Sequence, residues 1–317
     1  MPTQYLIPAS EAEWLEWRTK DVTSTEASAL FGMSPYSTAY ELWCQKKGTL
    51  PATFEDNDRM QAGRHIEPAI ASLVAERYGC SLSPMKGYSR DADDRMGASH
   101  DYRCEDGAAF GFPGEPGICE MKNVDWLVYR RGWSEGEAPD HIEIQLQHQL
   151  ELTGMAWGGI FALVGGNNVV GYVRARNPEV GAAIRRKIRD FWLSVDTDQA
   201  PPIIYPDDAD VVIAMNQFAG GDAYRAEEGD PLNELLAEFD AANTQASAAE
   251  VAKKIAKAKI LDLVGDASAI HWPGGKVSLT QVADSAGTLI TEDMVGQTYG
   301  GRKGYRLFRS TPTKTKE

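Results

Sequence analysis

The chain has 317 residues, 43% of them hydrophobic, and a formal net charge of −14. This length and composition predict a globular protein with one large domain and an appendage, or with two domains. There is no run of about 18 apolar residues and no signal-peptide pattern at the N-terminus, so we expect a cytoplasmic protein without a membrane segment. The four cysteines never show a C-x-x-C spacing, which argues against structural zinc and predicts reduced thiols.

The acidic net charge is unfavourable for a nucleic-acid enzyme, because phosphate contacts dominate such affinities. The charges are segregated along the chain, however. Acidic runs lie at 55–58, 91–94 and 207–210, and basic runs lie at 174–176, 185–189 and 302–316. This segregation is compatible with a basic channel on an acidic body. Ordinary solvated surface runs are the alternative, and the sequence leaves the two open.

The first third of the chain predicts helices. A capping box at 10–13 begins a helix that carries Trp14, Trp17 and Arg18, and a short helix follows over 26–31. A second capping box at 38–41 begins a helix that ends at Gly48. A long helix is expected over 58–78, with an apolar face at Ile66, Ile70, Leu73 and Val74, and Pro68 is expected to kink or break it after Glu67.

Strands and two further helices follow. Strands are predicted at 85–88, 95–103, 117–124, 160–164 and 169–174, and helices at 138–153 and from Asn177-Pro178 onward. Strands flanked by helices indicate a mixed α/β or α+β core. Its sheet is expected to be mixed, with both parallel and antiparallel strands. A change of composition near residue 207 predicts two domains, 1–206 and 207–317. In the second, 231–264 is expected to form a helical hairpin or one long helix, and 273–275 a turn between short strands.

Glu120 and Lys122 lie two residues apart in the predicted strand 117–124. Positions i and i+2 of a strand project from one face, so the carboxylate and the ammonium point the same way. An acid from a neighbouring strand completes a cluster for a hard divalent cation. Asp101 keeps strand spacing, and Asp93 and Asp94 are the competing acids. Such a cluster is typical of a metal-dependent phosphodiesterase. The spacing alone is common, and Lys122 is equally compatible with a strand-edge lysine that pairs with Glu120.

The surrounding motifs make this pattern more specific. Six elements occur in order at 14–18, 22–26, 63–68, 99–102, 120–122 and 144–149. Together they resemble the lambda-exonuclease-like, YqaJ-type viral recombinase family of the PD-(D/E)xK nucleases, over roughly the first two-thirds of the chain. The resemblance implies a restriction-endonuclease-like core with flanking helices and a C-terminal extension. One departure is the Ser99-His100-Asp101-Tyr102 turn, which lacks the family's Pro and Gly and adds an imidazole for which a bystander role is favoured.

The resemblance also implies roles for individual residues. It assigns metal binding to Asp101, Glu120 and the Met121 backbone carbonyl, with two Mg²⁺ ions per site and Mn²⁺ as a substitute. Lys122 would position the attacking water, Glu67 would act near the second metal, and Gln145 would support the site. Arg18, Thr25 and Ser99 fall where the family builds a pocket for a 5′-phosphate.

The implied activity is Mg²⁺-dependent 5′→3′ digestion of linear double-stranded DNA, which releases mononucleotides and leaves 3′ single-stranded tails. The implied partners are a single-strand annealing protein and further copies of the chain in a trimeric ring, in a phage or prophage setting within the bacterial cytoplasm. A structure-specific or sequence-specific endonuclease on the same core is the first alternative. A non-catalytic DNA-end-binding protein is the second.

Overall fold

The computed structural model describes residues 3–50, 58–133, 136–216, 223–273 and 275–279. The chain divides into two units, Met1–Met215 and Asn216–Glu317. The boundary predicted near residue 207 lies in the first unit, just before the short helix α7 (Ala209–Met215). Each unit is described by itself below.

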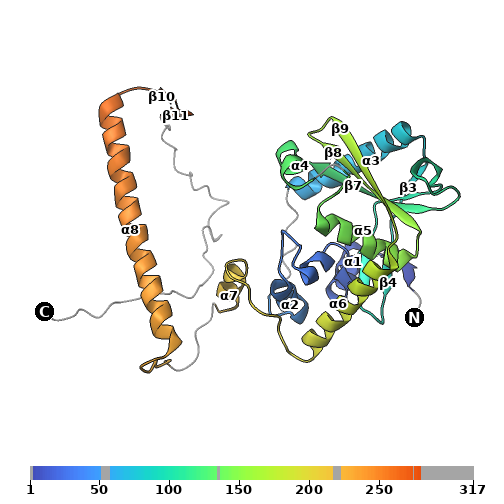
Figure 1. The fold of residues 1–317 in the computed structure, drawn as a ribbon, viewed down its shortest axis with the longest axis horizontal. Helices are drawn as coiled ribbons and strands as arrows, with labels where there is room; N and C mark the ends of the chain where they lie inside the picture. Colours follow the sequence, from blue (N-terminus) through green and yellow to red (C-terminus); the bar gives the residue numbers. More distant parts are fainter. Residues whose placement is uncertain (1–2, 51–57, 134–135, 217–222, 274, 280–317) are drawn as a thin grey trace, which may run out of the picture. The chain divides into compact units, whose positions relative to one another are not determined.

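A five-stranded mixed sheet forms the centre of the first unit (Figure 1). Its strand order is β3-β6-β7-β8-β9, with the bounds Leu82–Pro84, Tyr102–Cys104, Gly117–Val124, Trp157–Val164 and Asn168–Ala175. The strands β7 and β8 are parallel, and the other neighbours are antiparallel. The predicted mixed α/β core is therefore confirmed, and so is the predicted strand 117–124.

A second sheet has the order β1-β4-β5-β2, with the bounds Gln4–Leu6, Tyr88–Asp91, Met96–Ser99 and Val22–Thr23. Two predicted strands are wrong in detail here. Residues 85–87 lie between β3 and β4, so the strand predicted at 85–88 is misplaced. The strand predicted at 95–103 is two strands, β5 and β6, because the chain leaves one sheet and enters the other at His100 and Asp101.

The predicted N-terminal helices are α1 (Glu11–Lys20), the 3-10 helix η1 (Ala27–Phe31), α2 (Ala39–Lys47) and α3 (Asp58–Tyr78). The hydroxyls of Ser10 and Thr38 accept from the backbone N–H groups of Glu13 and Glu41, as the capping boxes predict. The helix α3 continues without a break through Pro68. Pro68 and Arg64 both lie on its exposed side, where water can bond the carbonyl that the proline leaves without a donor. The apolar position Leu73 is 44% exposed, contrary to the prediction.

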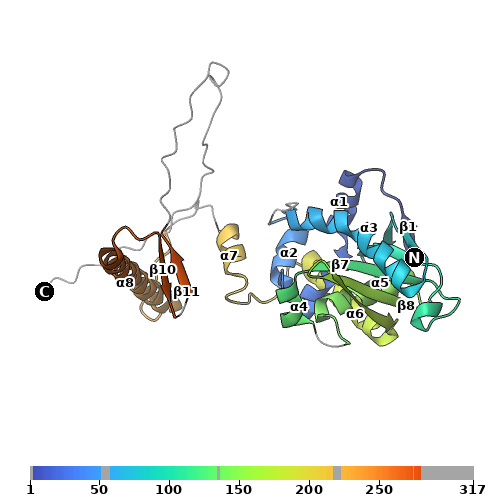
Figure 2. The same cartoon turned by 90° about the horizontal axis from the view of Figure 1, so that it is seen from above.

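Helices cover both faces of the five-stranded sheet. The helix α3 packs on one face with Cys119 and Met121, and α5 (Asp140–Thr153) packs on the other with Ile118 (Figure 2). Because side chains alternate along a strand, Glu120 and Lys122 of β7 point to the α5 face. A third core packs η1 and α2 against α6 (Pro178–Asp196), whose N-cap is Asn177 as predicted. The short helix α4 (Trp126–Gly132) follows β7 directly.

The second unit contains α8 (Pro231–Val264), which is one long helix and not a hairpin. The strands β10 (Ala269–Trp272) and β11 (Gly275–Ser278) pair antiparallel on either side of the predicted turn. Among the described residues, no helix combines the length and the apolar composition needed to cross a membrane. All four cysteines are free thiols, as predicted.

Candidate active site

The structure brings Asp101, Glu120 and Lys122 together at one edge of β7. Asp101 directly precedes β6, whose Tyr102 pairs with Cys119 of β7, so the Asp101 side chain comes beside Glu120. Its Oδ2 accepts the Met121 N–H at 2.8 Å. The Lys122 Nζ donates to Glu120 Oε2 at 2.9 Å. The change of sheet at His100 and Asp101 is therefore what delivers the second carboxylate to the strand that carries the first.

Two glutamines of α5 donate hydrogen bonds to Glu120, on the face of the sheet that α5 covers. The Gln145 Nε2 donates to Glu120 Oε2 at 2.7 Å, and the Gln149 Nε2 donates to Glu120 Oε1 at 2.6 Å. Gln145 lies where its predicted supporting role requires. No role was predicted for Gln149, although its spacing of four residues from Gln145 places both amides on one helix face.

The ionisable groups of this cluster shift one another's pKa values. Burial and the neighbouring Glu120 raise the pKa of Asp101 to about 8. Burial alone would also raise the pKa of Glu120, but the Lys122 ammonium and the Gln149 amide hold it below its ordinary value. Burial would lower the pKa of Lys122, but Glu120, Asp101 and Glu67 raise it above its ordinary value. The resting site thus holds an ionised Glu120, a charged Lys122 and a carboxyl at Asp101 that resists ionisation.

Glu67 and His100 lie next to these groups. Burial raises the pKa of Glu67, with Lys122 opposing and Glu120 adding to the rise, so Glu67 lies within electrostatic reach of both. His100 is buried, and its Nε2 shares a hydrogen bond of 2.8 Å with the Ser89 hydroxyl. Burial lowers the pKa of His100 to about 4, which keeps the imidazole neutral at neutral pH. A neutral imidazole held by Ser89 agrees with the favoured bystander role, which stays a prediction.

The donor set fits a hard divalent cation. Asp101 Oδ1 accepts no hydrogen bond from the described residues, and Glu120 Oε1 accepts only that of Gln149. The Met121 carbonyl points to the same edge of β7 as its N–H, toward Asp101. Within the described ranges, no group of three His, Cys, Asp or Glu side chains forms a preformed metal cage. Two carboxylates are nevertheless what Mg²⁺ needs when water and phosphate supply its other ligands. A bound cation would also relieve the repulsion that raises the pKa of Asp101.

The residues predicted to bind a 5′-phosphate are only partly brought together. The Arg18 guanidinium lies 4.7 Å from the centre of the Trp14 ring, and the Trp14 Nε1 donates to the Ser99 hydroxyl at 2.9 Å. Arg18 and Ser99 are therefore connected through Trp14, for which no role was predicted. The Thr25 hydroxyl bonds that of Thr23 at 3.2 Å and neither Arg18 nor Ser99.

The basic runs of the middle region are paired with acids. Arg185 contacts Asp91, Asp94 and Glu151, and further ion pairs join Arg189 to Asp94, Arg176 to Glu151 and Arg174 to Glu143. Asp91 and Asp94 of the acidic run 91–94 thus pair with Arg185 and Arg189 of the basic run 185–189, although the two runs are far apart in sequence. Arg174, Arg176, Arg185 and Arg189 are thus engaged by carboxylates, and the run 302–316 lies outside the described residues.

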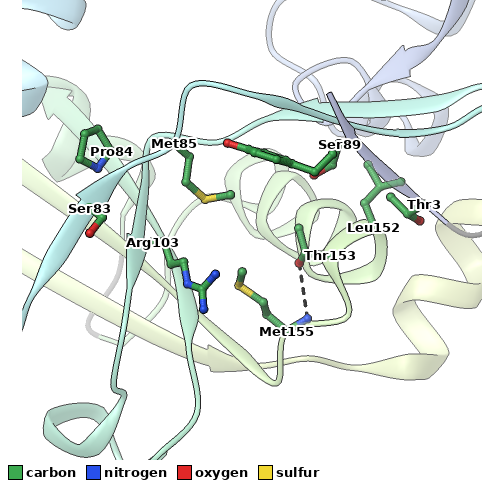
Figure 3. Close-up of a pocket in the computed structure, with 10 residues that line it drawn as sticks. Thr3, Ser83, Pro84, Met85, Ser89, Arg103, Leu152, Thr153 and Met155 are labelled. Atoms are coloured by element: carbon green, nitrogen blue, oxygen red, sulfur yellow. Dashed lines mark hydrogen bonds between the residues drawn. The ribbon is translucent and has the colours of Figure 1, made fainter. Parts of the chain in front are cut away.

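A pocket of about 440 Å³ lies at the C-terminal end of α5, where Leu152 and Thr153 line it (Figure 3). Arg103 reaches into it between Met85 and Met155, and Ser89 lines its wall. Ser89 also bonds His100, so one lining residue of this pocket contacts the segment that carries Asp101.

Comparisons with known proteins identify the region that contains this site. Residues 13–156 match the YqaJ-like viral recombinase domain. The chain is 25% identical over 185 residues to the uncharacterized protein YqaJ of Bacillus subtilis strain 168, a match that covers 58% of this chain. It spans 56% of the length of that curated relative.

Solved structures with a similar arrangement include two exonucleases. The alkaline exonuclease LHK-Exo of Laribacter hongkongensis is 19% identical with a TM-score of 0.47, over 59% of this chain and 94% of that one. A phage-related exonuclease of Haemophilus somnus 129PT is 14% identical with a TM-score of 0.35, over 61% of this chain and 91% of that one.

Proposed function

We propose that the chain is a Mg²⁺-dependent 5′→3′ exodeoxyribonuclease on linear double-stranded DNA, and the match of residues 13–156 to the YqaJ-like viral recombinase domain supports this proposal. The observation that carries the proposal is the cluster of Asp101, Glu120 and Lys122. Glu120 is buried and pairs with the Lys122 ammonium, and Asp101 lies beside them with one carboxyl oxygen that accepts no hydrogen bond from the described residues. This is the environment in which a metal-activated water and a phosphodiester can meet.

Each residue of the cluster has a chemical role in this proposal. Bound divalent cations would stabilise the charge that develops on the attacking and leaving oxygens. Asp101 and Glu120, with the Met121 carbonyl, would hold the metal. Lys122 keeps its proton, because the surrounding carboxylates raise its pKa, and so it orients the attacking water as a hydrogen-bond donor. Glu67 lies close enough to act near a second metal, through water.

The choice of DNA end is assigned to the pocket at α1. A guanidinium binds a terminal phosphate by a charged fork of N–H donors, and the Arg18 fork is steadied by the Trp14 ring. The Ser99 hydroxyl, two residues before Asp101, lies between this pocket and the metal site. A phosphate held there would fix the terminal nucleotide relative to the metals, which favours release of mononucleotides from the 5′ end.

The same proposal includes the surroundings of the enzyme. The products are mononucleotides and a duplex with 3′ single-stranded tails, which suit a single-strand annealing protein as partner. A trimeric ring around DNA and a cytoplasmic, phage or prophage setting complete it. Magnesium is the proposed metal, with manganese as a substitute.

Digestion of linear duplexes labelled at either the 5′ or the 3′ end, with and without Mg²⁺, tests polarity and cofactor together. We expect rapid release of the 5′ label as a mononucleotide only when Mg²⁺ is present. Covalently closed circular DNA should stay intact, and cutting of it would favour an endonuclease instead. The variant Lys122→Ala should lose nucleotide release but keep DNA binding, and unchanged turnover would exclude the role given to Lys122.

A further inference from the structure

One buried amide on α5 joins the two segments that carry the candidate metal ligands. The Gln149 Nε2 donates to Glu120 Oε1 at 2.6 Å and to the Ser99 backbone carbonyl at 3.0 Å. Ser99 ends β5, two residues before Asp101. A single side chain therefore ties the Glu120 carboxylate to the strand end that presents Asp101.

The orientation of this amide is fixed by its partners. Both acceptors are oxygens, so the side chain must turn its NH₂ group toward them, and each N–H serves one acceptor. The Gln149 Oε1 is left buried and without a hydrogen-bond partner among the described residues. An unpartnered buried acceptor is unfavourable for folding. The fold thus tolerates a defect at Gln149 in order to keep both donors on Glu120 and Ser99.

The two glutamines do different things to Glu120. Gln145 and Lys122 both donate to Oε2, whereas Gln149 is the donor to Oε1 within the described part of the chain. A carboxylate oxygen can accept two hydrogen bonds, so Oε1 keeps capacity for a cation. Gln149 therefore fixes the direction in which that oxygen faces.

We propose that Gln149 is a positioning residue, which orients Glu120 Oε1 for a divalent cation and sets its distance from the Ser99–Asp101 segment. The inference rests on the proposed function and adds to it. Ser99 also accepts the bond from Trp14, on whose ring Arg18 lies. The same amide thus connects the metal site to the pocket assigned to the 5′-phosphate.

The test compares Gln149→Met with Gln147→Met in the full chain. Gln147 is a second buried glutamine of α5, but it bonds the Ala175 carbonyl and the Asn177 N–H, away from Glu120. Titration calorimetry with Mn²⁺ measures metal affinity without any turnover. We expect Gln149→Met to bind Mn²⁺ about tenfold to a hundredfold more weakly, and Gln147→Met to bind as the wild type does. Saturating Mn²⁺ should restore most nucleotide release to Gln149→Met.

Thermal unfolding of both variants separates positioning from stability, because each loses two hydrogen bonds. Wild-type Mn²⁺ affinity in a folded Gln149→Met protein would overturn the inference and leave the proposed function intact. If the wild type itself does not bind Mn²⁺, the proposed function falls and this inference falls with it. If Gln149→Met does not fold, Gln149→Asn is measured in its place, since its shorter amide cannot reach both acceptors, and the same weakening is expected.

Discussion

Two clusters of charge lie in the first unit, and they differ in their balance. Around Arg185, three carboxylates meet three guanidinium groups, from Asp91, Asp94, Glu151, Arg176, Arg185 and Arg189. Around Lys122, its ammonium faces the carboxyl groups of Asp101, Glu120 and Glu67, and Arg64 is a second cation that acts on Glu67. Burial would raise the pKa of Asp94, but Arg189 and Arg185 lower it, whereas the pKa of Asp101 rises to about 8. The first cluster pairs its charges within itself, whereas the second holds three carboxyl groups beside the cations of Lys122 and Arg64.

Replacing one carboxylate in each cluster should give opposite results, and this is the largest expected effect. Asp101→Asn removes a candidate metal ligand, so nucleotide release should fall by at least about 10³-fold. It also removes repulsion with Glu120, so the free energy of unfolding of the metal-free protein should not fall. Asp94→Asn should lower the free energy of unfolding and leave nucleotide release nearly unchanged. Label release and urea unfolding measure the two quantities, and a less stable Asp101→Asn protein would contradict the comparison.

Removing the central cation of the balanced cluster should be costly for the fold. Arg185→Met leaves Asp91, Asp94 and Glu151 close together with fewer partners. Breaking a buried ion pair in this way costs about 3–5 kcal/mol, and partial exposure of Arg185 places this case at about 3 kcal/mol. Chemical unfolding of the wild type and the variant measures the loss.

The exposed neighbour Arg186 is the matched control for Arg185, since Arg186→Met should change the free energy of unfolding by less than about 0.5 kcal/mol. If Arg185→Met and Arg186→Met lose equal free energies of unfolding, the ion pairs around Arg185 do not contribute to stability.

This contrast also explains what the sequence predicts well and what it does not. The strand 117–124 and the caps at Ser10 and Thr38 depend on local patterns, and the structure confirms them. The pairing of the acidic run 91–94 with Arg185 joins residues more than ninety positions apart, and local patterns do not contain it. The same holds for the change of sheet at His100 and Asp101, which the sequence presents as one continuous strand.

Within the site, a similar division applies. The alternation of β7 puts Glu120 and Lys122 on one face, so their contact follows from spacing alone. The contacts of Trp14 and Gln149 could not be predicted from the sequence, because both residues bond Ser99, which lies far from them along the chain. Thr25 is the opposite case, since its place in a motif predicted a contact with the phosphate pocket while its hydroxyl bonds Thr23.

The two clusters should also respond to pH with opposite signs. A carboxyl whose pKa rises on folding stabilises the fold below its unfolded pKa, and this contribution is lost as pH rises through the folded pKa. For Asp101 the loss runs from about pH 4 to about pH 8 in the metal-free protein. For Asp94, whose pKa is lowered, the contribution is present above about pH 4 and is lost on acidification.

Urea unfolding of the wild type and Asp101→Asn across this range isolates the contribution of Asp101. The difference between the two proteins should change steadily from pH 4 to pH 8, in favour of the variant at the higher pH. Saturating Mg²⁺ should reverse that order at pH 8, because a bound cation favours the ionised carboxylate. If the difference in the free energy of unfolding does not vary with pH, folding does not raise the pKa of Asp101.

The smallest expected effect concerns the end of the DNA and not the chemistry. Arg18→Ala removes the only charged group predicted for the 5′-phosphate pocket, so the preference for 5′-phosphorylated over 5′-hydroxyl ends should fall by about tenfold. Lys20→Ala is the control, because Lys20 ends the same helix but pairs with Glu16 at an exposed position. Initial rates on matched 5′-phosphate and 5′-hydroxyl duplexes measure the preference. Its retention in Arg18→Ala would remove the pocket from the proposal but leave the metal cluster untouched, since Arg18 reaches that cluster only through Trp14 and Ser99.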